Sequence, residues 1–238
     1  MCRSNARILF INNTSLMGAG TSQSLLLMLK YFQESFEIFV VSDRHSQELT
    51  DALADYYIPH YGFRDRTVFF LPQLIFHILR HKIDLVYGNN LSGRSRVAFY
   101  AAKITGRPFI WHIRESVRDN DSRTKEVHFA DAVISNSEDT AERLRKFAHV
   151  KSPIVVPNGI DLDDFKIERN SFRKELIETL EIPEDATLIV NMGRVCHQKN
   201  QLEVIKICEP LIQKFKNLHC MFLGDFQDHD YLSDVSRK

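Results

Sequence analysis

Two cations stand near the end of the chain, where an apolar run gives way to a helix-like pattern. The run LIVNM (188–192) is followed by Gly193 and Arg194, and Lys199 comes five residues after the arginine. A glycine lets a ligand approach the backbone closely. Two cations beside a helix N-terminus can neutralise a diphosphate leaving group where no metal does so. A solvated basic turn explains the same pattern, so the residues alone leave both interpretations open.

A second group of reactive side chains follows another apolar run, in WHIRE (111–115). His112 could donate a hydrogen bond to a sugar hydroxyl or take part in proton transfer. Arg114 and Glu115 could pair with each other. A histidine whose hydrogen bonds are satisfied at the end of a strand is the structural alternative.

A third candidate is a pair of glycines, Gly18 and Gly20, between the first apolar run and the first helix-like segment. Glycines in this place hold the pyrophosphate in dinucleotide folds, and Asp43 stands near the position of a ribose-binding acid. However, Gln23 replaces the third glycine, and Gly18 comes six residues after the strand instead of at once. An NAD-dependent oxidoreductase is therefore a weaker alternative, and a flexible turn is the plain one.

The elements that position these residues alternate between short apolar runs and longer amphipathic segments. The predicted strands are 7–12, 36–42, 84–89, 108–113, 131–137 and 153–158, and the predicted helices are 20–32, 47–56, 71–82, 93–105 and 137–147, the last capped by Ser137. Apolar strands alternating with helices predict an α/β fold, a Rossmann-like parallel sheet with helices on both faces. Ligands bind such sheets beyond the carboxyl ends of the strands, where His112 is expected to lie.

A shorter alternation follows a turn-like linker, NGIDLDDF (158–165). It comprises helices at 170–180 and 199–215 and strands at 186–192 and 218–224. We therefore predict an N-terminal domain over residues 1–168 and a partial C-terminal domain over 169–238, an incomplete second Rossmann-like unit.

Composition narrows the function classes. The chain has 238 residues with 31 basic and 31 acidic side chains, a balance that gives no support to nucleic-acid binding. The four cysteines form no CxxC pair, which indicates free thiols in a reducing cytoplasm. The histidines show no HExxH spacing, so we expect no metal site. No apolar run has the length of a membrane span.

Taken together, the chain resembles family 4 glycosyltransferases, which are retaining enzymes of the GT-B fold. The matching pieces, in the family's order, are MGAGTSQSLL, DLVYGNN, PFIWHIRE, ADAVISNSEDTAERL, VVPNGIDLDDF and NMGRVCHQKNQLEVI. The resemblance implies transfer of a sugar from a nucleotide diphosphate sugar to an acceptor hydroxyl of a glycan or glycolipid, with no cofactor or metal. It also implies a setting in polysaccharide or glycolipid assembly.

The resemblance also implies roles for the candidate residues. Gly18 and Gly20 would form the loop near the acceptor and the donor phosphates, and His112 would contact the donor sugar. Arg194 and Lys199, with Gly193 beside them, would bind the donor diphosphate. The domain over 1–168 would be the acceptor side, and the partial domain over 169–238 the nucleotide-sugar donor side.

One departure from the family is large. Its members usually carry two glutamates eight positions apart in the second domain, and no pair in this sequence has that spacing. We therefore expect an incomplete form, truncated within the C-terminal domain, with little transferase activity alone. The alternative is a non-catalytic binding module or subunit completed by a partner chain.

The resemblance further implies a cytoplasmic protein with peripheral contact at the inner face of the membrane. The segment 63–82 mixes basic and apolar residues and is the candidate for that contact, although a helix with one buried face explains it as well.

Overall fold

A computed structural model describes residues 5–12, 20–42, 47–62, 67–166 and 169–225, together with Tyr231 and Val235. The chain divides into two compact units, Met1–Leu162 (unit 1) and Asp163–Lys238 (unit 2). This boundary lies six residues before the one predicted from the sequence, which follows residue 168. The acceptor-side and donor-side roles of the two parts stay predictions.

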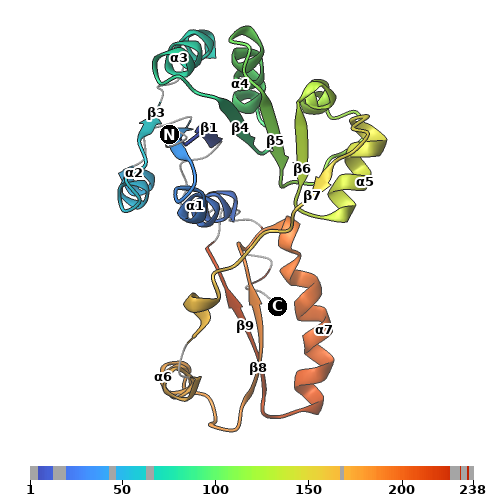
Figure 1. Cartoon of the computed structure of the whole chain (residues 1–238). Helices are drawn as coiled ribbons and strands as arrows, with labels where there is room; N and C mark the ends of the chain where they lie inside the picture. The colour runs from blue at the N-terminus through green and yellow to red at the C-terminus, as the bar shows by residue number, and fades with distance from the viewer. Residues whose placement is uncertain are drawn as a thin grey trace. The chain divides into compact units, whose positions relative to one another are not determined.

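Unit 1 is built on a seven-stranded sheet in the order β3-β2-β1-β4-β5-β6-β7 (Figure 1). Every neighbouring pair in it is parallel. The strands are β1 (Arg7–Asn12), β2 (Glu37–Ser42), β3 (His60–Gly62), β4 (Leu85–Asn89), β5 (Phe109–Ile113), β6 (Ala132–Ser135) and β7 (Ile154–Val155). The predicted parallel α/β fold is confirmed.

Helices cover both faces of this sheet. Leucines of α1 (Gly20–Phe32) and α2 (Gln47–Ala54) pack with Ile8, Phe10 and Val40 on one face. The other face is covered by α3 (Thr67–Arg80), α4 (Gly93–Ile104) and α5 (Glu138–Phe147). Figure 1 shows α1 and α3 on opposite sides of the strands. Burial on both faces explains why the strands have continuous apolar sequences.

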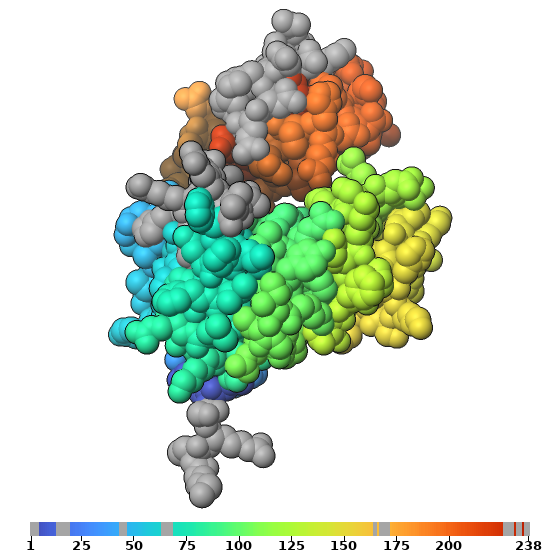
Figure 2. Space-filling view, turned by 90° about the horizontal axis from the view of Figure 1, so that it is seen from above, coloured from blue at the N-terminus to red at the C-terminus, as the bar shows by residue number. Residues whose placement is uncertain are grey.

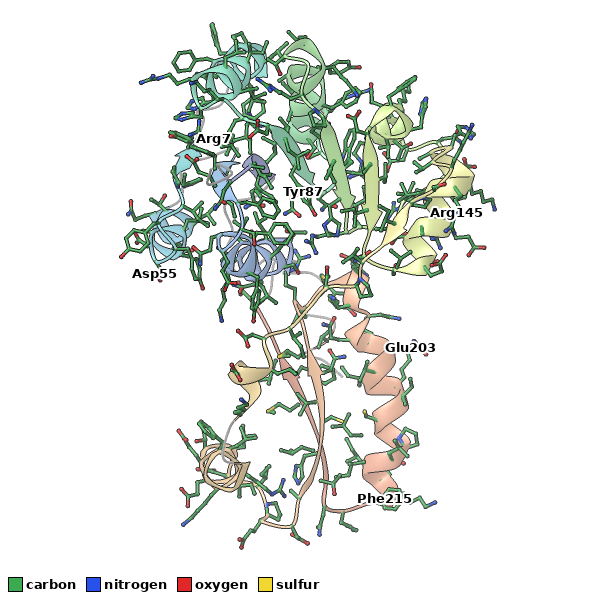
Figure 3. The ribbon with its side chains drawn as sticks, in the orientation of Figure 1. Arg7, Asp55, Tyr87, Arg145, Glu203 and Phe215 are labelled. Atoms are coloured by element: carbon green, nitrogen blue, oxygen red, sulfur yellow. The ribbon has the colours of Figure 1, made fainter. Side chains whose placement is uncertain are left out.

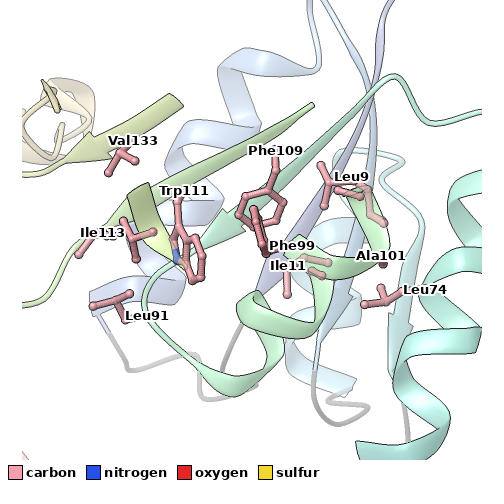
Figure 4. Close-up of a cluster of buried hydrophobic side chains, with 14 of the residues drawn as sticks. Leu9, Ile11, Leu74, Leu91, Phe99, Ala101, Phe109, Trp111, Ile113 and Val133 are labelled. Carbon is pink, nitrogen blue, oxygen red and sulfur yellow. The ribbon is translucent and has the colours of Figure 1, made fainter. Parts of the chain in front are cut away.

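The larger core cluster centres on aromatic rings of β5 and α4 (Figure 4). Phe109 lies edge-on to Trp111 at 5.4 Å and to Phe99 at 5.6 Å between ring centroids. The indole N–H of Trp111 donates to the carbonyl of Asn90 at 3.0 Å, so burial leaves no unsatisfied donor there.

Local signals fix several element ends. Ser92 and Ser137 cap α4 and α5 by accepting from the backbone N–H groups of Ser95 and Thr140. The predicted cap at Ser137 is thus confirmed. Helix α3 begins at Thr67, whereas the predicted helix began at residue 71, because Phe70 belongs to its buried face. Pro72 therefore lies inside the helix.

Unit 2 pairs β8 (Thr187–Met192) with β9 (Leu218–Leu223) in parallel. Its helices are α6 (Arg169–Leu180) and α7 (Gln201–Lys214), and α7 continues through Pro210. In the part of unit 2 that is described, β8 leaves Val190 and Met192 48% and 82% exposed.

Within the described residues, the helices are too short or too polar to cross a bilayer.

Gly88 of β4 offers a test of the core. A Cβ atom there would lie 2.7 Å from Cζ of Phe109 and 3.4 Å from Cβ of Ser95. We expect Gly88→Ala to lower the free energy of unfolding by about 1–3 kcal/mol, because the ring is held in the core and cannot move aside. Urea unfolding measures the change.

Gly93→Ala is the matched control, since a Cβ atom at Gly93 would meet nothing within 4 Å. It should change stability by less than about 0.5 kcal/mol. Equal effects of the two substitutions would contradict the packing seen around Gly88.

Candidate functional site

The carboxyl end of the unit 1 sheet carries a row of buried polar side chains. Asn12 is in register with Ser42 on one side and with Asn89 on the other, and Asn89 is in register with His112. All four are buried, His112 at 3% exposure and the others at 0%. Parallel strands end at the same edge, so the sequence expectation that His112 lies at this edge agrees with the fold.

The strand pleat explains why the row shares one face. Phe10, Val40 and Tyr87 stand two residues before Asn12, Ser42 and Asn89 and belong to the core cluster beneath α1 and α2. Side chains two apart on a strand point the same way. The row therefore continues the α1 face of the sheet, where hydrophobic residues give way to polar ones.

His112 forms a hydrogen bond with the buried hydroxyl of Tyr87. The phenol oxygen lies 2.6 Å from Nδ1 of His112 and 3.6 Å from the sulfur of Met28 on α1. Figure 3 shows Tyr87 in the interior of unit 1. An imidazole nitrogen accepts more strongly than a thioether, so we assign the phenol hydrogen to Nδ1. The proton of the neutral ring then sits on Nε2, which is buried and has no hydrogen-bond partner in the described structure.

Burial keeps both members of this pair neutral. Desolvation, reinforced by the charge of Arg114, lowers the pKa of His112 to about 3. Desolvation raises the pKa of Tyr87 to about 12, against the smaller opposite effect of Arg114. Near neutral pH His112 is therefore a hydrogen-bond donor and not a cation.

Arg114 lies among asparagines. Its Nε donates to Oδ1 of Asn89 at 2.9 Å, and its Nη1 donates to Oδ1 of Asn158. The backbone N–H of Arg114 donates to Oδ1 of Asn90 at 3.3 Å, and its carbonyl accepts from Nδ2 of Asn136 at 3.1 Å. These bonds connect the ends of β4, β5 and β6 with the segment after β7.

The expected pair of Arg114 with Glu115 does not form. Glu115 instead accepts from Nη1 of Arg123 at 2.9 Å, and Arg123 also pairs with Asp121 at 2.7 Å. Adjacent residues after a strand diverge, because successive side chains point to opposite sides.

The NGID motif spans part of this edge. Asn158 accepts from Arg114, and Asp161 pairs with Lys30 of α1 at 2.5 Å while only 8% exposed. The bond raises the pKa of Lys30 above its ordinary value. The segment after β7 therefore contacts first Arg114, which follows β5, and then Lys30 of α1.

The glycine loop is described only at its end. Gly20 begins α1, and the carbonyl of Thr21 lies 3.5 Å from Nδ2 of Asn89. The first turn of α1 therefore adjoins the polar row. Gly18 and Asp43 lie outside the described residues.

In unit 2, Gly193, Arg194 and Lys199 lie on the loop between β8 and α7. Gly193 adopts a φ of 153°, and its N–H donates to the carbonyl of Leu223 at 2.8 Å. A Cβ atom at Gly193 would lie 3.6 Å from the Cδ and Cε atoms of Lys199, so the lysine stem passes close to the glycine. Arg194 and Lys199 are both exposed.

Gln201 braces this loop. It is fully buried, its Nε2 donates to the carbonyl of Arg194 at 2.9 Å, and its Oε1 accepts from the backbone of Cys196 at 3.4 Å. Neither Gln201 nor Tyr87 was a candidate site residue from the sequence. A tyrosine inside a doubly covered parallel strand was a usable signal, because a buried phenol needs a partner. Gln201 gave no comparable signal.

Among the described residues, no cluster of three or more His, Cys, Asp or Glu side chains could hold a metal ion.

Solved structures share this fold. HepE from Anabaena, in complex with UDP, has 19% identity, a TM-score of 0.80 and coverage of 97% of this chain. A glycosyltransferase from Rickettsia africae has 14% identity, a TM-score of 0.81 and 99% coverage. This chain spans 65% of the length of each. UDP-GlcNAc 2-epimerase from Neisseria meningitidis has 13% identity, a TM-score of 0.65, and coverage of 97% of this chain and 68% of its own.

The parallel sheet with helices on both faces, shared with these structures, thus defines an α/β fold of the GT-B type. Because an epimerase has a similar fold, the sequence comparison decides the family. Residues 18–164, more than half of the chain, match Glycosyltransferase Family 4, and the chain belongs to that family. A comparison with curated proteins gave no match.

Burial of His112 predicts a pH dependence of stability. Its pKa is about 3 in the folded chain against an ordinary 6.5, so between these values the unfolded chain binds a proton that the folded chain does not. Stability should therefore fall as the pH drops below 6.5, by up to about 1.4 kcal/mol per pH unit from this residue, and be flat above it.

His112→Phe removes that contribution. In urea unfolding at pH values between about 7 and 4, the stability difference between wild type and variant should shift in the variant's favour as the pH falls. His128→Gln, at a histidine that is exposed, is the control substitution. Parallel curves for His112→Phe and wild type would show that His112 titrates normally.

Proposed function

We propose that this protein transfers a sugar from a nucleotide diphosphate sugar to an acceptor hydroxyl with retention at the anomeric carbon. The bond between the anomeric carbon and the diphosphate oxygen breaks, and the acceptor oxygen bonds to that carbon on the same face and loses its proton. Membership of Glycosyltransferase Family 4 carries the proposal. The UDP and UDP-glucose complexes of HepE are consistent with such a donor.

His112 is proposed to contact the donor sugar. A neutral Nε2–H in a desolvated site is suited to donate to a sugar hydroxyl, since it brings no charge that the sugar would have to balance. Tyr87 fixes the tautomer that makes this donation available.

Arg194 and Lys199 are proposed to bind the diphosphate. Their exposure on the loop before α7 leaves them accessible to a ligand, and the N-terminus of α7 adds partial positive charge. Positive charge aimed at the departing diphosphate lowers the barrier without a metal ion. Gly193 belongs to the same proposed diphosphate-binding loop of unit 2, and Gly18 and Gly20 are proposed to form the glycine loop of unit 1.

The proposed setting is polysaccharide or glycolipid assembly in the cytoplasm.

The second candidate function is a subunit that is completed by a partner chain. The exposed side chains of Val190 and Met192 on β8 favour it. Light scattering distinguishes this subunit from a transferase that acts alone, since a monodisperse monomer counts against the subunit.

Substitution of the two cations tests the donor role. We expect Arg194→Gln and Lys199→Gln each to weaken UDP binding roughly tenfold in calorimetric titration at low salt, because each removes a charged hydrogen bond to phosphate. The variants should also slow release of UDP from UDP-sugars.

Lys214→Gln, in the last turn of α7, is the control of equal charge change and should bind UDP as wild type does. Unaltered UDP affinity in both cation variants would refute the diphosphate site. NAD binding that is tighter than UDP binding would favour an oxidoreductase.

Peripheral membrane contact is proposed through α3. Phe69, Phe76 and Leu79 are 57–60% exposed, and Arg80 follows them. At 100° per residue the three fall on one side of the helix, as an interfacial helix requires. Figure 2 shows α3 on the surface of unit 1 beside α4.

Phe76→Ser should reduce the fraction bound to anionic phosphatidylglycerol vesicles about tenfold in co-sedimentation, because a buried phenylalanine ring contributes about 1.5–3 kcal/mol. Phe129→Ser, at a phenylalanine 61% exposed outside α3, is the control and should bind as wild type does. Equal losses in both variants would argue against α3.

A further inference from the structure

The guanidinium of Arg114 is a positive charge without a negative partner in the described structure. Its side chain donates to Asn89 and Asn158, both neutral amides. The neighbouring acids are engaged elsewhere, Glu115 with Arg123 and Asp161 with Lys30.

This charge is also partly withdrawn from water. Burial lowers the pKa of Arg114 below its ordinary value, and the same charge acts on both Tyr87 and His112. A desolvated cation held only by neutral groups is unfavourable unless something compensates it. An anion that binds at this edge would supply the compensation.

Unused donors gather around the same edge. Nη2 of Arg114 makes no hydrogen bond to a described residue, whereas Nε and Nη1 are fixed by amides that orient the guanidinium plane. Nε2 of His112, two residues before Arg114 on the same strand edge, is also buried without a hydrogen-bond partner in the described structure. A planar guanidinium with free N–H groups matches the paired oxygens of a carboxylate or phosphate.

We propose that Arg114 binds an anionic group, a phosphate or a carboxylate, carried by the acceptor. The proposal rests on the proposed function and on the predicted acceptor side of the N-terminal domain, with Arg194 and Lys199 proposed to bind the donor diphosphate. The acceptor class is therefore an anionic sugar or a phosphate-bearing lipid, and Arg114 selects it over a neutral glycan.

The single tryptophan of the chain reports on this site. The indole of Trp111 donates to the carbonyl of Asn90, and Oδ1 of Asn90 accepts from the backbone of Arg114. Inorganic phosphate and acetate are titrated into the protein while tryptophan emission is recorded, with chloride exchanged to hold the ionic strength constant. Saturation by phosphate alone points to a phosphate-bearing acceptor, and saturation by acetate as well points to a carboxylate.

Three variants distinguish anion binding by Arg114 from a purely structural role of this side chain. Arg114→Gln should weaken the saturable response at least tenfold, and Arg118→Gln, at an exposed arginine a few positions later in the sequence, should leave it unchanged. Asn158→Ala breaks a bond to the guanidinium but keeps its charge, so it should retain binding within about threefold. If Arg114 only stabilises the fold, Asn158→Ala and Arg114→Gln should change the tryptophan emission to the same extent. The emission of the wild type should then not depend on added phosphate or acetate.

UDP binding distinguishes this proposal from the donor site. Arg114→Gln should bind UDP within about twofold of wild type, since the two cations proposed to bind the diphosphate, Arg194 and Lys199, are unchanged. A tenfold loss of UDP affinity would overturn the acceptor assignment, because the anion would then be the donor's. Absence of a saturable phosphate or acetate response in wild type, with normal UDP binding, would overturn the Arg114 proposal and leave the proposed transferase function intact. Failure of wild type to bind UDP would overturn the transferase function and with it the acceptor role of Arg114, even if the anion response remained.

Discussion

The register of the parallel sheet is the constraint on which the unit 1 site depends. Asn12, Ser42, Asn89 and His112 form one row only because four strands pair at one level. A slip of one residue in β5 would turn His112 to the opposite face and separate it from Tyr87. The apolar residues that precede the row prevent that slip, since each must return to its own core cluster. Core packing therefore positions the polar chemistry.

Burial then decides which groups carry charge. Within one sheet edge His112 is kept neutral while Arg114 remains a cation, because an imidazole loses its proton near neutrality and a guanidinium does not. The two side chains stand two residues apart yet offer different chemistry, a neutral donor and a fixed charge. Tyr87 extends the difference, since it selects which imidazole nitrogen holds the proton.

Sequence reasoning succeeded where the signal was local. Continuous apolar runs predicted six of the strands of unit 1, and Ser137 predicted its cap because capping needs only neighbouring residues. It missed β3, whose three residues carry no apolar run and pair only at the sheet edge. It also misassigned the partner of Arg114, because Asn89 and Asn158 come from elements far away in the chain. Site residues could be named from sequence, but not their partners.

The two candidate anion sites are built on different principles. In unit 2 the backbone shapes the loop: a Cβ atom on Gly224 would lie 2.0 Å from the carbonyl oxygen of Gly193, and Asn200 takes a left-handed conformation before α7. The cations on that loop are exposed, so salt screens them. In unit 1 the amides of Asn89 and Asn158 hold a partly desolvated charge, which salt screens less. The exposed cations of unit 2 suit a leaving group that must depart after the reaction. The fixed guanidinium of unit 1 suits a substrate that must be held in one orientation.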